Sequence, residues 1–172
     1  MLVKAQNFFI IRKWGIALAV LAFVVDILTK QMALKAEPFR EVFIPGLVEW
    51  TLSFNRGVSF NFLGNIDGTM GDLMPYKLSA LAIVARIFFL WWMGQKGSIY
   101  LQLGLGLMMG GALGNMVDRL NYGAVIDFVS LRFGEHPFFI CNGADIFISA
   151  GVGCILLDGF IEWRDKRRGI TS

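Results

Sequence analysis

The chain has 172 residues, which is short enough for a single domain, and it is 56% hydrophobic and only 17% charged. Soluble domains are usually about 45–50% apolar and about 25% charged, so this composition excludes an ordinary soluble protein and favours a membrane protein. The net charge of +3 is too small to argue for nucleic acid as a partner.

The first apolar segment, residues 14–34, follows a short basic lead and predicts the first of four transmembrane helices. Its apolar part has the length of a signal-peptide core. The helical pattern nevertheless continues through Asp26 and Lys30, and no small-residue cleavage site follows closely. We therefore expect a retained span. Asp26 and Lys30 are four positions apart, so they lie on one face of this helix.

The segment 41–64 alternates in part between apolar and polar residues and is interrupted by turn signals such as Asn55-Arg56-Gly57. This pattern predicts a small β-sheet at the membrane surface. Residues 65–75, which are rich in glycine, are expected to form a loop or a short surface helix.

Three further apolar segments are predicted as the second, third and fourth spans: 77–94, 99–117 and 138–160. The third contains glycines at four-residue spacing, Gly106, Gly110 and Gly114, which provide a flat face for close approach of another helix. Four spans place both termini on one side, and a modest excess of Lys and Arg there puts them in the cytoplasm. We thus expect one all-α membrane domain over residues 1–172, with a small extracytoplasmic sheet.

Polar side chains gather near the outer ends of these spans, in the stretch 110–145. Asp127 lies in an apolar run that can fold back toward the helix ends. Asp145 is expected about seven residues into the fourth span, roughly 10 Å below its outer end. Ionisable groups at membrane depth are costly and therefore indicate a functional site. The alternative is a polar loop between two buried helices, whose aspartates serve as caps and turn formers.

Asp127 and Asp145 are candidates to face each other, and the chemistry that they suggest is aspartyl hydrolysis. Two close carboxyls in a site of low dielectric cannot both ionise easily, so one keeps a proton. The ionised carboxyl can take a proton from water while the protonated one polarises the scissile carbonyl. The pair titrates as a unit, so neither role is assigned to either residue.

A metal site is not predicted, because His136 is the only histidine and no HExxH pattern occurs. Two other classes of protein compete with the hydrolase. One is a small membrane transporter or ion pathway in which Asp26, Lys30, Asp118 and Asp145 form a proton or cation relay. The other is a structural partner that packs through its glycine face. A relay would need polar stations across the whole membrane, whereas these groups cluster at one side.

Five motifs occur in order along the chain: DILTK (26–30), FNRGVSF (54–60), GGALGNMVDRL (110–120), GAVIDF (123–128) and NGAD (142–145). With them the chain resembles bacterial lipoprotein signal peptidase, the type II signal peptidase. The resemblance implies an aspartyl endopeptidase of the cytoplasmic (inner) membrane, acting at its extracytoplasmic face. Such an enzyme cleaves the signal peptide from diacylglyceryl-modified prolipoproteins just before the lipidated cysteine.

Asp127 and Asp145 match the catalytic pair of that family. The remaining matched positions are expected to bind substrate or support the site: Asp26, Lys30, Asn55, Arg56, Gly57, Asn115, Asp118, Arg119 and Asn142. The resemblance further implies a monomer that needs no metal or cofactor and is inhibited by globomycin. It also implies contact with membrane lipids, with the segment 41–64 forming a small β-cradle that lies on the membrane. Cys141 and Gly143 depart from the family pattern, in which an aromatic or apolar residue is expected at position 141 and a branched aliphatic residue is usual at position 143.

Overall fold

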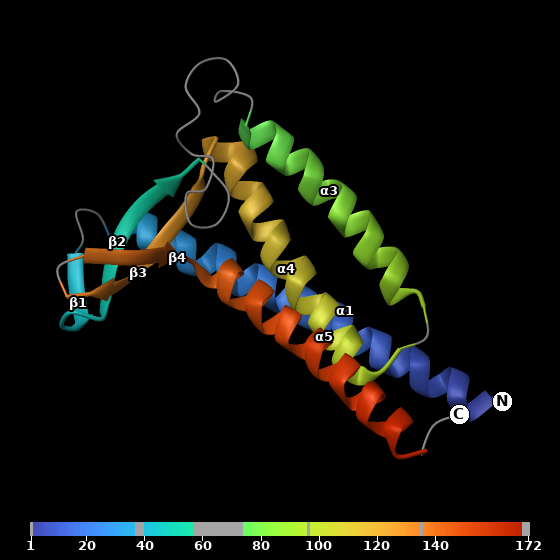
Figure 1. Ribbon diagram of the computed structural model, residues 1–172. Coiled ribbons are helices and arrows are strands. Elements are labelled where there is room, and N and C mark those ends of the chain that lie inside the picture. The colour runs from blue at the N-terminus through green and yellow to red at the C-terminus, as the bar shows by residue number, and fades with distance from the viewer. Residues whose placement is uncertain (1, 37–39, 57–73, 96, 135, 170–172) are drawn as a thin grey trace.

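The computed structural model describes residues 2–36, 40–56, 74–95, 97–134 and 136–169. The described part of the chain is mostly helical, with a four-stranded antiparallel sheet at one end of the helices (Figure 1). The elements in chain order are α1 (Leu2–Lys35), β1 (Arg40–Ile44), β2 (Val48–Asn55), α3 (Met74–Met93), α4 (Ile99–Tyr122), β3 (Val125–Phe133), β4 (His136–Cys141) and α5 (Gly143–Arg167).

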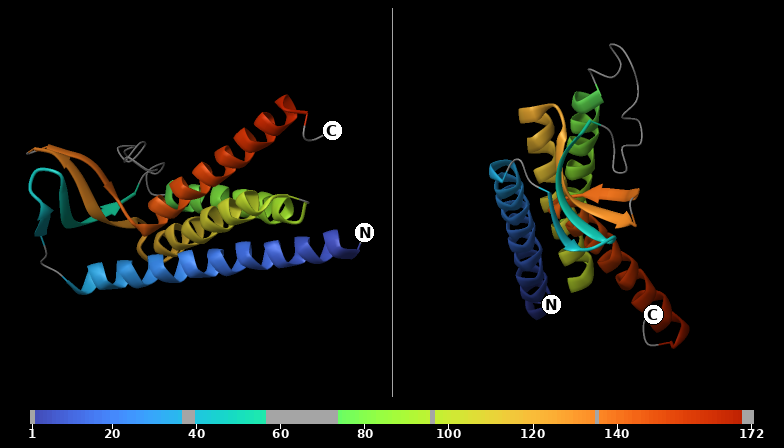
Figure 2. Two further views of the ribbon diagram at one scale, coloured as in Figure 1. Left: turned by 90° about the horizontal axis from the view of Figure 1, so that it is seen from below. Right: turned by 90° about the vertical axis from the view of Figure 1, so that its left-hand side faces the viewer.

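Helix α4 is central, since α1, α3 and α5 all pack against it. Its apolar side chains Leu101, Leu105 and Met109 form a buried cluster with Ala19 of α1 and Met93 of α3. Figure 2 shows α1 and α4 running side by side, with α5 crossing them. Helix α1 begins and α5 ends at the end of the molecule that lies away from the sheet.

The predicted glycine face of α4 packs against α1. A Cβ atom added to Gly106 or Gly110 would overlap backbone carbonyl oxygens of α1, and one added to Gly114 would overlap the carboxylate of Asp26. Glycine at these positions therefore brings the two helix backbones into direct contact. As a result, the polar side chains of α1 reach those of α4 near the sheet.

The sheet has the strand order β1-β2-β3-β4, and every neighbouring pair is antiparallel. The turns between β1 and β2 and between β3 and β4 both lie at its free end, where Gly134 donates its backbone N–H to the carbonyl oxygen of Gly46 at 3.0 Å. Both glycines have positive φ angles, 72° for Gly46 and 61° for Gly134, a conformation that other residues rarely adopt. At the opposite end, β3 and β4 connect directly to α4 and α5.

The sheet and the start of the last helix differ from the sequence-based expectation. Strands β1 and β2 fall at the predicted segment, of which residues 57–64 lie outside the described part, but β3 and β4 were not predicted. The expected fourth span, 138–160, was wrong at its start, because 138–141 belong to β4 and the helix begins at Gly143. A short apolar run has no periodicity that separates strand from helix. Asp145 accordingly lies in the first turn of α5, and the expected depth of seven residues was wrong.

Two of the four expected spans are confirmed as helices long and apolar enough to cross a membrane, Ile10–Lys35 and Gly143–Arg167. The segments expected as the second and third spans form helices α3 and α4. That these two helices also cross a membrane, and that both termini are cytoplasmic, stays a prediction. The segment 65–75 includes residues outside the described part.

The close contact between α1 and α4 predicts that Gly110→Val destabilises the protein by about 1–3 kcal/mol, because the new side chain overpacks against Ala19. Thermal unfolding in detergent would measure this loss. Gly153→Ala is the matched control, since a Cβ there meets no atom within 4 Å, and its stability should equal or slightly exceed that of the wild type. Equal stability of the two variants would contradict the packing argument.

Candidate active site

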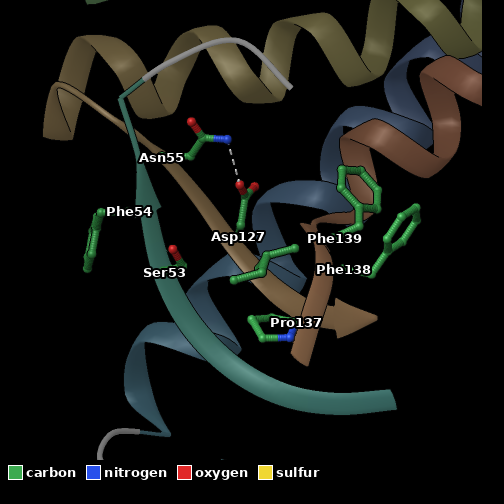
Figure 3. A pocket seen from close by; sticks show the side chains of 8 residues that line it. Ser53, Phe54, Asn55, Asp127, Pro137, Phe138 and Phe139 are labelled. Carbon is green, nitrogen blue, oxygen red and sulfur yellow. Dashed lines mark hydrogen bonds between the residues drawn. The ribbon is translucent and has the colours of Figure 1, made fainter. Parts of the chain in front are cut away.

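Asp127 reaches the junction of sheet and helices because β3 starts almost immediately after α4. Gly123 caps α4 with a φ of 67° and donates its backbone N–H to the carbonyl oxygen of Arg119 at 3.1 Å, which turns the chain into the strand. Asp127 then pairs with Ser53 of β2 across the sheet. The side chain of Asn55 donates a hydrogen bond to Asp127 Oδ2 at 3.0 Å, as Figure 3 shows.

Asp145 is held by the cap of α5. Asn142 Oδ1 accepts the backbone N–H of Asp145 at 3.1 Å, and Asp145 Oδ2 accepts the backbone N–H of Asn142 at 3.3 Å. This reciprocal capping box satisfies N–H groups at the helix start and fixes the carboxylate there. Asn115 of α4 also donates to Asp145 Oδ1, at 3.3 Å.

Asn142 links the two aspartates. Its side-chain amide donates to Asp127 Oδ1 at 2.6 Å, while its backbone N–H binds Asp145 as described. The same amide donates to Asn115 Oδ1 at 3.2 Å. Asp127 from β3 and Asp145 from α5, separated by a hairpin in the sequence, are thus bound to one residue.

A buried ion cluster lies behind the pair. Lys30 Nζ is 2.7 Å from Asp26 Oδ2 and 2.8 Å from Asp118 Oδ2, and it donates a hydrogen bond to Asn115 Oδ1 at 2.8 Å. All four side chains are buried. The expectation that Asp26 and Lys30 share a helix face is confirmed, and Lys30 links α1 to α4.

A narrow cavity of about 10 Å³ lies between the two aspartates, which is room for about one water molecule. Its lining is formed by Asn55, Asn115, Arg119, Val125, Asp127 and Asp145. The half-buried Arg119 also donates from Nη1 to the carbonyl oxygen of Asn115, at 3.4 Å. A water molecule here would meet two carboxyls, amides and a guanidinium.

A larger cleft of about 380 Å³ opens on the other side of Asp127. It lies between the end of β2 and the strand β4 and is lined by Ser53, Phe54, Asn55, Asp127, Pro137, Phe138, Phe139 and Ile140. In Figure 3, Asn55 points toward Asp127, whereas Phe54 points away from it. The cleft therefore gives access to the Asp127 carboxyl between polar and aromatic side chains.

Burial raises the pKa of Asp127 to about 7. The negative charge of Asp145 acts in the same direction, while hydrogen bonds from Asn55 and Asn142 oppose the shift. Burial also raises the pKa of the Cys141 thiol to about 11, so this thiol stays protonated at neutral pH. The pKa of Asp127 therefore lies close to neutral pH, the range in which a general acid or base is most effective.

The structure brings together nine of the residues singled out from the sequence: Asp26, Lys30, Asn55, Asn115, Asp118, Arg119, Asp127, Asn142 and Asp145. Arg56 follows β2 and is exposed, and Gly57 lies outside the described residues. Sequence reasoning missed the cleft residues Ser53 and Pro137. The turn at Gly134 between two apolar runs was the signal for the hairpin that carries Pro137. Among the described residues, no group of three or more His, Cys, Asp or Glu side chains could hold a metal ion.

The chain is similar to proteins of known function. The family model described as signal peptidase (SPase) II matches residues 18–161. The lipoprotein signal peptidases of Brucella ovis and Brucella melitensis are each 34% identical to this chain over 113 residues, which are 66% of this chain and 68% of the relative.

Two solved structures share the fold, and each is described as a bacterial membrane enzyme. One aligns with a TM-score of 0.72 and 25% identity and covers 88% of both chains. The other aligns with a TM-score of 0.69 and 26% identity and covers 83% of this chain and 90% of that chain.

The raised pKa of Asp127 predicts a dependence of stability on pH. Its folded pKa of about 7 exceeds the ordinary value of about 4, so the folded state binds more protons between these values. The stabilisation is full below about pH 4 and is lost as pH rises through about 7. Asp127→Asn removes this titration, so its melting temperature should fall less between pH 4 and pH 8. Asp165→Asn, at the far end of α5, is the control and should keep the pH dependence of the wild type. If the melting temperature of Asp127→Asn fell with pH as steeply as that of the wild type, the raised pKa of Asp127 would be contradicted.

Proposed function

We propose, because this chain belongs to the signal peptidase II family, that it is an aspartyl endopeptidase in which Asp127 and Asp145 carry out the hydrolysis. Family membership makes the protein a bacterial membrane peptidase that removes lipoprotein signal peptides. The proposal adds the mechanism and the bond: cleavage just before the diacylglyceryl-modified cysteine. The single observation that carries it is Asn142, which binds both carboxyls.

The two carboxyls share one proton at neutral pH, because two negative charges that are buried close together repel each other. The narrow cavity between them has room for the water molecule that would attack the substrate. The ionised carboxyl takes a proton from this water, the water oxygen bonds to the scissile carbonyl carbon, and the protonated carboxyl gives its proton to the carbonyl oxygen. When the tetrahedral intermediate collapses, the C–N bond breaks, the carboxyl that took the proton from water gives it to the amine nitrogen of the cysteine, and the other carboxyl takes its proton back from the hydroxyl group.

Polar neighbours prepare this step. Asn142 and Asn115 donate to Asp127 and Asp145 respectively, which keeps the carboxyls oriented before substrate binds. Arg119 lines the cavity and contributes positive charge close to the two carboxyls, which carry a negative charge between them throughout the step. Asn55 orients Asp127 from the β2 side.

The substrate enters through the 380 Å³ cleft. This cleft lies at the sheet end of helices long and apolar enough to cross a membrane, and Asp145 belongs to the first turn of one of them. A lipidated cysteine keeps its acyl chains in the bilayer, so its peptide bond meets the pair at the membrane surface. We place this surface at the extracytoplasmic face of the inner membrane. We expect the protein to act as a monomer and to be inhibited by globomycin.

Asp127→Asn and Asp145→Asn should each lower the cleavage rate at least about a hundredfold, because an amide neither takes up nor gives a proton in this step. Cleavage of a synthetic diacylglyceryl-cysteine prolipoprotein by the purified protein in detergent would measure the rate. The same peptide without lipid should be cleaved poorly.

Glu162→Gln is the matched control, since it alters an exposed carboxyl at the opposite end of α5 and should keep the wild-type rate. A folded Asp127→Asn or Asp145→Asn variant with a near-normal rate would remove that residue from the proposed pair. Failure of the wild type itself to cleave the lipidated peptide would overturn the proposed function.

A further inference from the structure

The residue before each aspartate of the pair donates its backbone N–H to a buried carboxylate. Ile126, which precedes Asp127, donates to Asp118 Oδ2 at 3.2 Å. Ala144, which precedes Asp145, donates to Asp26 Oδ1 at 2.7 Å. Both acceptors are buried, and neither belongs to the strand or the helix that it holds.

Lys30 joins these two acceptors. Its ammonium lies 2.7 Å from one carboxylate and 2.8 Å from the other, so the positions of Asp26 and Asp118 are set relative to a single nitrogen atom. Two negative charges buried this close together would repel each other without the cation between them. The chain of contacts therefore runs without a gap from Ile126, through Asp118, Lys30 and Asp26, to Ala144.

We propose that the buried ion triad Asp26–Lys30–Asp118 is a positioning device that sets the separation of the Asp127 and Asp145 carboxyls. Each end of the triad holds the backbone one residue before a carboxyl, and the shared ammonium fixes the distance between the two ends. The expected effect on kcat rests on the proposed function, whereas the contacts of the triad with the two backbone N–H groups do not. The triad acts through backbone groups and does not touch the substrate.

Lys30 adds a second link to the same pair. Its hydrogen bond to Asn115 Oδ1 orients that amide, so the Nδ2 group of Asn115 faces Asp145 Oδ1. The opposite orientation of this amide would place its NH2 group against the Lys30 ammonium and its oxygen against the Asp145 carboxylate, so both hydrogen bonds would be lost. One cation thus fixes both the backbone and the hydrogen-bond donor of Asp145.

The test compares two variants of Asp118 that remove the same charge. Asp118→Asn keeps a side-chain oxygen that can accept the N–H of Ile126, whereas Asp118→Ala removes the acceptor. We expect Asp118→Ala to lower kcat at least about tenfold with KM changed less than about twofold, because small misplacements of reacting groups strongly slow the chemical step. Asp118→Asn should keep kcat within about threefold of the wild type.

Two readouts separate positioning from a merely structural role. The first is hydrogen exchange, in which the Ile126 amide should lose protection in Asp118→Ala and keep it in Asp118→Asn. The second is the pH–rate profile, whose two limbs should move closer together in Asp118→Ala, because carboxyls that lie farther apart influence each other less. The titratable groups that surround the pair are Asp26, Lys30, Asp118, Arg119 and Cys141, and both variants lose only the charge of Asp118.

A corresponding pair of variants, Asp26→Asn and Asp26→Ala, tests the other end of the triad through the Ala144 amide. This pair replaces the first one if Asp118→Ala does not fold. Glu162→Ala is the control, because it breaks an exposed ion pair of the same four-residue spacing and should leave kcat and both amides unchanged. Equal kcat in the alanine and asparagine variants, or unchanged protection of the held amide in the alanine variant, would overturn the proposal. The exchange readout needs no turnover, so a wild type without activity would overturn only the proposed function.

Discussion

Lys30 is 1% exposed, and its burial is the constraint to which the surrounding polar groups respond. A buried ammonium is strongly unfavourable unless charged partners surround it, and removing one partner of such a pair typically destabilises a protein by about 3–5 kcal/mol. Asp26 on the same helix and Asp118 on α4 provide these partners. Gly114 lets α4 come close enough, since a side chain there would overlap the carboxylate of Asp26. Together these contacts hold α1 and α4 in one register.

The chemistry of the site follows from where β3 and α5 begin relative to the packed helices α1 and α4. Strand β3 starts just after α4, and α5 starts just after β4, so two aspartates from different elements meet at one junction. Burial raises the pKa of Asp127 to about 7. The junction opens into a cleft with both polar and aromatic side chains, at the end of helices that are long and apolar enough to cross a membrane. A carboxyl whose pKa lies near neutrality at this place is consistent with the proposed substrate, which would carry lipid beside its scissile bond.

Much of this arrangement could be predicted because it depends on local patterns. Long apolar segments predicted helices, glycines at four-residue spacing predicted a packing face, and the ordered motifs led to a family that the comparisons confirm. The start of α5 could not be predicted, because the apolar residues before Asn142 fit a strand and a helix equally well. Their strand conformation depends on pairing with β3, which is a contact between segments.

The sequence by itself determined the composition of the helices, the kinds of polar groups near their ends and the family to which the chain belongs, since these are properties of single residues and short spacings. Only the tertiary structure decided which groups share a cation or a hydrogen bond. Lys30 and Asn115, for example, are 85 positions apart, and Asn55 and Asp127 are 72 apart. Such partners are chosen by helix packing and strand register, because a hydrogen bond forms only when two groups come within about 3 Å of each other.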